Sequence, residues 1–377
     1  MYPLSSFPMK YLCSFLLLLF FAFNSNAQSN GAFVHKGSTR TFITYVPPTY
    51  NPATPVPLVL VLHGLTMSAS SIMSVTGFNN IAQSNNFIAV YPDGLNNDWN
   101  FGGTGASSTD DVGFLNALID SICTHYSIAT NRIYSCGFSA GGFMSYRMAC
   151  ESGKCFAAIA SVSGTMGTSI YNNCVPSHLC SVMQIHGTSD FIVPYAGALN
   201  NESVDNVMQK WIGANNCTMT AAISNLPDNN LSDLSTVTSY QYFPCNSNTE
   251  VLLYKVSGGG HQWPGTSSIL GGLGTINMDI NASDEIWNFF SRHTCADVNG
   301  IAPLAETKQT WTLHTIGEKL FSIEGEEAIN AINVYSVNGQ LQMTTKNPHI
   351  NLNGFAAGCY MIQIQGAKSI KQYKILL

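Results

Sequence analysis

The sequence has little charge. Charged residues occupy only 10% of its 377 positions, against roughly 25% in ordinary soluble domains. The 15 basic and 21 acidic residues give a formal net charge of −6, and the basic residues do not gather into the positive face that phosphate binding requires. A nucleic-acid partner is therefore excluded. A disordered chain is excluded as well, because 45% of the residues are hydrophobic.

The sequence also lacks the common metal-binding motifs. It contains no Cys-x-x-Cys and no His-Glu-x-x-His, which are spacings that bring zinc ligands together. We therefore expect no metal and no other cofactor.

Long apolar runs are absent except near the N-terminus. Lys10 precedes an apolar run over 11–23, and a polar stretch with small residues ends at Ala27. The run is shorter than the roughly 20 residues that span a bilayer, and it has the pattern of a secretory signal peptide over 1–27. We expect a mature protein without a membrane span that is secreted, either extracellular or at the cell surface.

Export makes disulfide bonds the expected state of paired cysteines. Ten of the eleven cysteines lie beyond the leader, and Cys136 lies in an apolar run that is typical of a small buried thiol. Four of the others lie close together and a further two flank a polar insert, so we expect two or three bridges, with the pairing left open. These six candidates are Cys150, Cys155, Cys174, Cys180, Cys217 and Cys245.

Strand and helix patterns alternate over 28–296. Short runs rich in Val, Ile, Leu and aromatic residues predict strands, and apolar residues at helical spacing predict helices between them. The predicted strands are 41–46, 58–62, 87–91, 132–136, 156–162, 181–186 and 251–256, and the predicted helices are 70–85, 110–125, 143–149, 201–215 and 283–293. The alternation indicates an α/β fold, with a mostly parallel central sheet and helices on both faces.

The pattern changes after a predicted linker over 297–303. Residues 304–377 contain no convincing helix, and Asn338-Gly339 is typical of a hairpin turn. The formal charge changes as well, from −8 over 28–300 to +1 over 301–377. We expect a second domain here, a small all-β sandwich. Its clearest predicted strands are 329–336, 341–345 and 360–365.

One Gly-x-Ser-x-Gly pattern occurs in the sequence, Gly137-Phe138-Ser139-Ala140-Gly141. A predicted strand leads into it and a predicted helix leaves it, which is the context of a nucleophile elbow. The sharp turn needs glycines, because neighbouring Cβ atoms would clash, and it exposes the serine hydroxyl at the edge of the sheet. We therefore take Ser139 as the candidate nucleophile.

A serine nucleophile needs a histidine base and a carboxylate that orients it. In this type of fold they follow the serine along the chain, first the acid and then the histidine. Asp190 and His261 each follow a predicted strand at the same sheet edge, and three glycines precede His261. We take Asp190 as the orienting acid, with Asp205 as the remaining alternative, and His261 as the base.

Other histidines and acids have simpler interpretations. His63 ends a predicted strand before a glycine, so its backbone is expected to shape the oxyanion loop, and His186 within a strand is expected to be a core residue. Asp93 lies in a Tyr-Pro-Asp-Gly turn. The pair Asp110 and Asp111 is expected to cap a helix.

Two backbone N–H groups would form the oxyanion hole, one after the nucleophile and one in the loop after an early strand. By position, these belong to Ala140 and Leu65, with Thr66 as the neighbour of Leu65. Trp99, Phe138 and Trp263 are the candidates for lining the substrate cleft, since aromatic rings supply large apolar contact surfaces.

Short motifs over 40–295 together resemble the polyhydroxybutyrate-depolymerase-like esterases. The resemblance implies an α/β-hydrolase fold and the triad Ser139, Asp190 and His261, and the family includes feruloyl and acetylxylan esterases. The motifs are His63-Gly64, Tyr91-Pro92-Asp93-Gly94, Asp110-Asp111-Val112-Gly113-Phe114-Leu115, Arg132-Ile133-Tyr134, the Gly-Phe-Ser-Ala-Gly elbow, His186-Gly187-Thr188-Ser189-Asp190 and Gly259-Gly260-His261-Gln262-Trp263-Pro264-Gly265.

The C-terminal segment is similar to type IX secretion sorting domains. The similarity lies in residues 333–339, 352–354, 358–362 and 374–377, and it implies the outer-membrane secretion machinery as a partner. The alternative for this segment is a carbohydrate-binding sandwich, because sandwiches host many functions.

The elbow and its partners predict a secreted serine carboxylesterase that works through an acyl-enzyme. The resemblance implies plant cell-wall polysaccharide as the substrate, through feruloyl or acetyl esters of xylan. The charge of −8 over 28–300 argues against strongly anionic polymers. Two alternatives stay open: a depolymerase of polyhydroxybutyrate-type or aromatic polyesters, and a non-catalytic glycan-binding surface protein.

Overall fold

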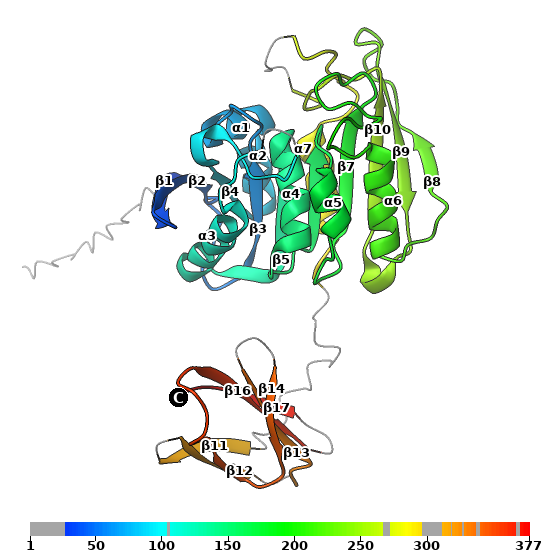
Figure 1. The fold of residues 1–377 in the computed structure, drawn as a ribbon. Coiled ribbons are helices and arrows are strands. Elements are labelled where there is room, and N and C mark those ends of the chain that lie inside the picture. The colour runs from blue at the N-terminus through cyan, green and yellow to red at the C-terminus, as the bar shows by residue number, and fades with distance from the viewer. Residues whose placement is uncertain are drawn as a thin grey trace, which may run out of the picture. The chain divides into compact units, whose positions relative to one another are not determined.

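The computed structural model describes residues 27–103, 106–266, 272–295, 311–317, 319–325, 328–336, 340–366 and 370–377. The chain divides into two compact units, Met1–Val298 and Asn299–Leu377, and each is described by itself (Figure 1). The predicted leader up to residue 26 and the predicted linker at 297–303 lie outside the described residues.

A ten-stranded sheet runs through the first unit in the order β1-β2-β4-β3-β5-β6-β7-β10-β9-β8. The central strands from β4 to β10 in this order are parallel, whereas the two strands at each edge are antiparallel. The strands are β1 (Gln28–His35), β2 (Ser38–Tyr45), β3 (Val56–Leu62), β4 (Ile88–Pro92), β5 (Ile128–Phe138), β6 (Ala158–Val162), β7 (Ser181–Gly187), β8 (Ala222–Asn225), β9 (Thr236–Tyr242) and β10 (Val251–Ser257).

The middle of the sheet is buried on both faces. Successive side chains of a strand point to opposite faces, and in β3 the side chains of Leu58, Leu60 and Leu62 belong to one core while those of Val59 and Val61 belong to the other. A strand covered on both sides favours apolar residues at nearly every position, which explains the nearly continuous apolar runs in the sequence.

Helices cover the two faces of the sheet (Figure 1). The core that contains Leu58 also contains residues of α3, α4 and α6, and the core that contains Val59 contains residues of α1, α2 and α7. This layered arrangement confirms the predicted α/β-hydrolase fold. The helices are α1 (Ala69–Thr76), α2 (Phe78–Asn85), α3 (Asp111–His125), α4 (Ala140–Glu151), α5 (Thr168–Asn173), α6 (Val204–Ala214) and α7 (Ala282–Ser291).

The predicted helix over 70–85 is divided into α1 and α2. Gly77 lies between them with a φ of 60°, a left-handed conformation that ends a helix and that glycine adopts readily. The sequence did not predict β1, β8, β9 or α5. All four side chains of β8 are exposed and those of β1 are mostly exposed, so these edge strands carry no apolar pattern to detect.

The second unit consists of two antiparallel sheets, β11-β12-β15 and β14-β13-β16-β17. It has its own core, which includes Trp311, Phe321, Ile332 and Ile362. β13 pairs with β14 as the hairpin pattern predicted, although Asn338-Gly339 lies outside the described residues. The strands are β11 (Trp311–Gly317), β12 (Leu320–Gly325), β13 (Ala331–Ser336), β14 (Leu341–Thr345), β15 (His349–Asn351), β16 (Cys359–Gln365) and β17 (Ile370–Leu376).

Three disulfide bonds are present in the described part of the chain. One of the six candidates is wrong, because Cys180 is a free, buried thiol. Cys295, which was not among the candidates, pairs with Cys155. Cys180 directly precedes β7 and joins the core of the sheet, where burial raises the pKa of its thiol. Cys136 is free and buried, as expected. The bridges are Cys150–Cys174, Cys155–Cys295 and Cys217–Cys245.

Disulfide bonds are typical of proteins that fold in an oxidising compartment. The helices of the described ranges are all too short or too polar to cross a bilayer.

Candidate active site

Ser139 lies on a sharp turn between β5 and α4, as expected for a nucleophile elbow. Its backbone has φ 52° and ψ −119°, a strained conformation that costs about 1–3 kcal/mol. A Cβ on Gly137 would lie 2.3 Å from the carbonyl carbon of Gly141, and a Cβ on Gly141 would lie 2.2 Å from the carbonyl oxygen of Leu62. These close approaches explain why both positions are glycine.

A buried hydrogen bond joins Asp190 and His261. The Nδ1 of His261 lies 2.8 Å from Oδ2 of Asp190, and both side chains are buried. The other carboxylate oxygen accepts the N–H groups of Ile192 and Val193 at 2.9 and 2.8 Å, which holds the carboxylate in place. Because a carboxylate accepts hydrogen bonds, Nδ1 donates, and Nε2 is left with a lone pair that can take a proton.

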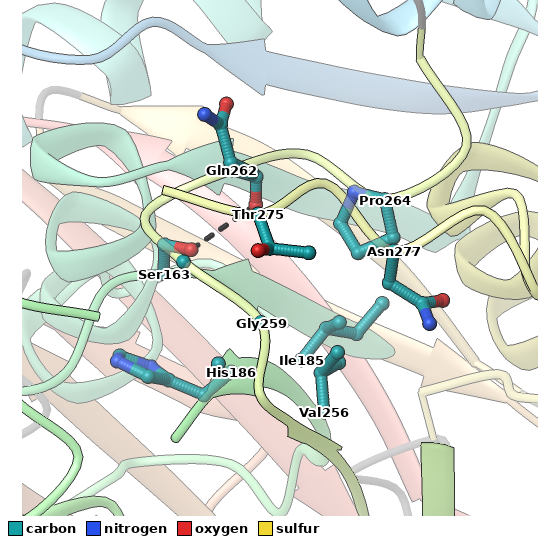
Figure 2. Close-up of a pocket in the computed structure, with 11 residues that line it drawn as sticks. Ser163, Ile185, His186, Val256, Gly259, Gln262, Pro264, Thr275 and Asn277 are labelled. Carbon is teal, nitrogen blue, oxygen red and sulfur yellow. Dashed lines mark hydrogen bonds between the residues drawn. The ribbon is translucent and has the colours of Figure 1, made fainter. Parts of the chain in front are cut away.

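A backbone hydrogen bond holds the loop that carries His261. The N–H of His261 donates to the carbonyl oxygen of Leu273 at 2.8 Å. A small cavity lies beside this loop, and its lining includes Ser163, Gln262 and Thr275 (Figure 2). The Ser163 hydroxyl donates to the carbonyl oxygen of Gln262 at 3.2 Å. With a volume of about 10 Å³, this cavity has room for a single water molecule at most. It is too small to admit a substrate.

A larger pocket of about 240 Å³ is lined by both Ser139 and His261. The candidate nucleophile and base therefore share one cavity. A mostly apolar cleft with a few converging polar groups is the usual form of a small-molecule site. The other side chains and backbone around it come from Gly64, Leu65, Thr66, Met67, Phe138, Ile192 and Leu273.

The loop after β3 borders this pocket and contains the predicted oxyanion donor. The N–H groups of Thr66 and Met67 donate to backbone carbonyl oxygens. The N–H of Leu65 finds no acceptor among the described residues, and neither does that of Ala140 at the start of α4. An oxyanion hole requires donors that are not already engaged. Leu65 and Ala140 meet this requirement, and Thr66 does not.

The imidazole of His63 fixes the same loop. Its Nδ1 lies 2.7 Å from the carbonyl oxygen of Gly64, and its Nε2 accepts the N–H of Gly94 at 2.9 Å. Burial lowers the pKa of His63, which favours the neutral form that makes both bonds. The carbonyl of Gly64 and the N–H of Leu65 belong to one planar peptide, so His63 also fixes the direction of that N–H. The sequence indicated only the backbone of His63.

Two predicted substrate-binding residues lie in the core instead. Trp99 is fully buried, and its Nε1–H donates to the carbonyl oxygen of His63 at 2.9 Å. Trp263 is buried as well, and its Nε1–H donates to Ser283 Oγ at 3.0 Å. Neither lines the pocket, which corrects both predictions: large rings with a satisfied N–H fill the interior here. Phe138 does line the pocket, 4.9 Å from the His261 ring between centroids.

His186 is a buried neighbour of the Asp190 carboxylate. Its Nε2 lies 2.8 Å from the carbonyl oxygen of Val193, and its Nδ1 lies 3.0 Å from the side-chain nitrogen of Gln184. The same Nε2 lies 3.5 Å from Oδ2 of Asp190. Burial lowers the pKa of His186, although the Asp190 charge opposes this. His186 is thus a hydrogen-bonded core histidine, as expected, which also contacts the candidate acid.

The structure separates the two acids between which the sequence left a choice. Asp205 lies in the first turn of α6 and accepts a hydrogen bond from Tyr195 at 3.0 Å. Asp190, and not Asp205, meets His261.

Three lining residues were not predicted from the sequence: Met67, Ile192 and Leu273. Each lies in a loop, where apolar residues show no periodicity. The one available signal was their position shortly after a predicted strand end or motif residue.

Comparison with known proteins places this geometry in a family. The model of the phospholipase/carboxylesterase family matches residues 49–239. A bifunctional acetylxylan esterase/xylanase of Neocallimastix patriciarum is 28% identical over 267 residues, which are 69% of this chain and 34% of the relative. Feruloyl esterase B of Piromyces equi is 28% identical over 220 residues, which are 54% of this chain and 39% of the relative. The chain thus spans between a third and two fifths of the length of these two relatives.

Among solved structures, an acetyl xylan esterase from Aspergillus awamori aligns with a TM-score of 0.48 at 13% identity. The alignment covers 70% of this chain and 99% of that one.

Proposed function

Because the chain belongs to the phospholipase/carboxylesterase family, we propose that it is a serine carboxylesterase acting on esters of plant cell-wall polysaccharide. The observation that carries the proposal is the pocket shared by Ser139 and His261, with Asp190 hydrogen-bonded behind His261. The names of the relatives support feruloyl and acetyl esters of xylan as the substrate class.

The proposed chemistry proceeds through an acyl-enzyme. Ser139 Oγ attacks the ester carbonyl carbon while Nε2 of His261 takes its proton. The oxyanion that forms accepts hydrogen bonds from the N–H groups of Leu65 and Ala140. The bond to the leaving alcohol then breaks as His261 returns the proton to the alcohol oxygen. A water molecule, deprotonated by the same imidazole, attacks the carbonyl carbon of the acyl-enzyme. The bond from that carbon to Ser139 Oγ then breaks, His261 returns the proton to Oγ, and the carboxylic acid leaves. Asp190 orients the ring throughout.

The pocket supports an aromatic acyl group more than an acetyl group. Its volume of about 240 Å³ would remain mostly empty around an acetyl group. A planar hydroxycinnamoyl group would bury its ring against Met67, Phe138 and Leu273, and each 100 Å² of apolar surface removed from water stabilises binding by about 2.5 kcal/mol. We therefore place feruloyl esters first within the proposed substrate class.

The first experiment separates a catalyst from a glycan-binding protein. We expect the purified protein to hydrolyse p-nitrophenyl acetate, and Ser139→Ala to lower kcat by about 10⁶-fold with an unchanged circular dichroism spectrum. A folded parent protein without turnover would favour the non-catalytic alternative. A Ser139→Ala variant that keeps most of its activity would remove Ser139 as the nucleophile.

The second experiment addresses the acyl group and the polymer. Methyl ferulate, acetylated xylan and polyhydroxybutyrate are compared at equal enzyme concentration. The proposal expects the highest kcat/KM on methyl ferulate. A preference for polyhydroxybutyrate would favour the polyester depolymerase instead, and a preference for acetylated xylan would move the assignment to acetyl esters.

We further propose that residues 304–377 form a type IX secretion sorting domain, whose partner is the outer-membrane secretion machinery. The separate core around Trp311 and Ile362 supports a domain that folds without the esterase unit. Deletion of 301–377 is expected to leave kcat/KM on p-nitrophenyl acetate unchanged and to stop release from cells that carry the export system. Normal release of the truncated chain would contradict this role.

A further inference from the structure

A second cavity lies next to the active-site pocket. It has a volume of about 600 Å³ and lies between the β1–β2 edge of the sheet and the start of α1, within the range of roughly 300–1,000 Å³ common for ligand sites. Met67 lines the active-site pocket, and the next residue, Ser68, lines this cavity. Two consecutive residues of one loop therefore border the two cavities.

The pleat of the edge strands directs one set of side chains to this cavity. Gln28, Asn30 and Ala32 alternate along β1 and so share one face, and Thr41 of β2 pairs with Ala32 across the ladder. Ser29 lies between the first two and points to the opposite face. All three β1 side chains that face the cavity are exposed, so a ligand from solvent can reach them.

The polar groups of the cavity suit a neutral ligand with many hydroxyl groups. The side-chain amides of Gln28 and Asn30 have no hydrogen-bond partner within the described part of the chain, and each offers both donors and an acceptor. Ser68 Oγ and Ser70 Oγ lie 2.9 Å apart. Thr41 donates to Asp93 at 2.8 Å and keeps its lone pairs free.

The cavity does not suit an anionic ligand. None of the described residues that line it is Lys, Arg or His, and Asp93 contributes a carboxylate. Ile43 and Ala69 add apolar surface between the polar groups. A surface with alternating hydroxyl, amide and apolar groups matches a pyranose chain, which presents hydroxyl groups along its edges and C–H groups on its faces.

We propose that this cavity is a subsite for the neutral sugar chain of the polysaccharide substrate, an assignment that rests on the proposed esterase function. With the acyl group in the apolar pocket beside Ser139, the alcohol side of the ester must leave that pocket. The backbone at Met67–Ser68 borders both cavities, so the sugar chain extends over it and binds between β1 and α1.

The test fills the cavity without touching the acyl pocket. Ala32→Trp places a large ring in the subsite, and Ser29→Trp places the same ring on the opposite face of the same strand as the control. We expect Ala32→Trp to raise KM for a feruloylated xylo-oligosaccharide at least fivefold and to keep kcat/KM for methyl ferulate within twofold. Ser29→Trp is expected to change neither value.

Two results would overturn the proposal. One is an unchanged KM for the oligosaccharide ester in Ala32→Trp, and the other is an equal loss on both substrates in a variant with the parent's melting temperature. Should Ala32→Trp fail to fold, Asn30→Ala combined with Ser70→Ala removes two polar partners and is held to the same expectation.

A direct binding measurement keeps this subsite distinct from the esterase proposal. Unsubstituted xylohexaose is titrated into the Ser139→Ala protein and into Ser139→Ala with Ala32→Trp. We expect saturable binding to the first and at least a fivefold weaker Kd for the second. Absence of binding to the first would overturn the subsite even if methyl ferulate is hydrolysed. Binding with no hydrolysis of methyl ferulate by the parent would reject the feruloyl esterase alone.

Discussion

Three buried histidines determine how the candidate site can work, and each is held in one tautomer. His261 donates from Nδ1 to Asp190, and His63 contacts Gly64 through Nδ1. His186 contacts Val193 through Nε2. A neutral imidazole has one donor and one acceptor nitrogen, so the fixed carbonyl or carboxylate acceptor decides which nitrogen keeps the proton. In His261, Nδ1 is engaged by Asp190, and Nε2 is therefore the ring nitrogen that can accept a proton.

At this scale, His186 is predicted to position Asp190 and not to react. His186→Phe keeps an aromatic ring but leaves the Val193 carbonyl oxygen without its partner, which costs about 1–3 kcal/mol. The Gln184 side-chain nitrogen loses its contact with His186 and keeps its hydrogen bond to the Gly164 carbonyl oxygen. We expect kcat on methyl ferulate to fall roughly tenfold to a hundredfold with KM nearly unchanged, and His186→Gln to recover part of the loss. Equal kcat for His186→Phe and the parent would contradict a positioning role. If the two variants lose kcat/KM to the same extent and also lose melting temperature to the same extent, His186 has a structural role only.

At the scale of secondary-structure elements, the elbow depends on close contact between α4 and β3. The first turn of α4 approaches the end of β3 so closely that the Gly141 position has no space for a side-chain carbon. The motif therefore encodes a contact between elements as well as a turn within the chain, because β3 lies beside β5 in the sheet.

The corresponding prediction compares two helical glycines. Gly141→Ala places a Cβ 2.2 Å from the Leu62 carbonyl oxygen, and overpacking of this kind costs about 1–3 kcal/mol or more. Gly213→Ala, in the last turn of α6, has no atom within 4 Å of the new Cβ and is expected to stabilise the helix by up to about 1 kcal/mol. Denaturant unfolding measures both. A neutral Gly141→Ala would show that α4 and β3 can separate without cost.

At the scale of the first unit, a charged cluster joins the start of β10 to the residues after α7. Burial favours the neutral form of Glu250, but hydrogen bonds from His293 and Arg292 outweigh it and lower the pKa to about 2. Arg292 contacts Glu250 at 2.8 Å and His293 contacts it at 3.2 Å. The Cys155–Cys295 bond lies two residues further along, so the end of this unit is held both covalently and by charge.

This cluster predicts how stability depends on pH. The pKa of Glu250 is lower in the folded unit than in the unfolded chain, where the pKa of a glutamate is about 4.3. Its contribution is therefore complete above about pH 5 and is lost as the pH falls toward 2. The free energy of unfolding should decrease from pH 6 to pH 3 by more in the parent than in Glu250→Gln, with the surface variant Glu151→Gln as the control. Equal pH dependence of the free energy of unfolding in the parent and in Glu250→Gln would contradict this prediction.

The sequence by itself determined the features that depend on near neighbours along the chain. The elbow at Ser139, the buried parallel strands and the strand-end positions of Asp190 and His261 all follow from residue type and short spacing, because backbone geometry and burial periodicity are local. Only the tertiary structure decided that Asp190 rather than Asp205 meets His261, that Trp99 and Trp263 fill the core, and that Cys155 pairs with Cys295, 140 residues away. Contacts over such separations depend on how strands order in the sheet and which side chains share a face, and no local pattern encodes that order.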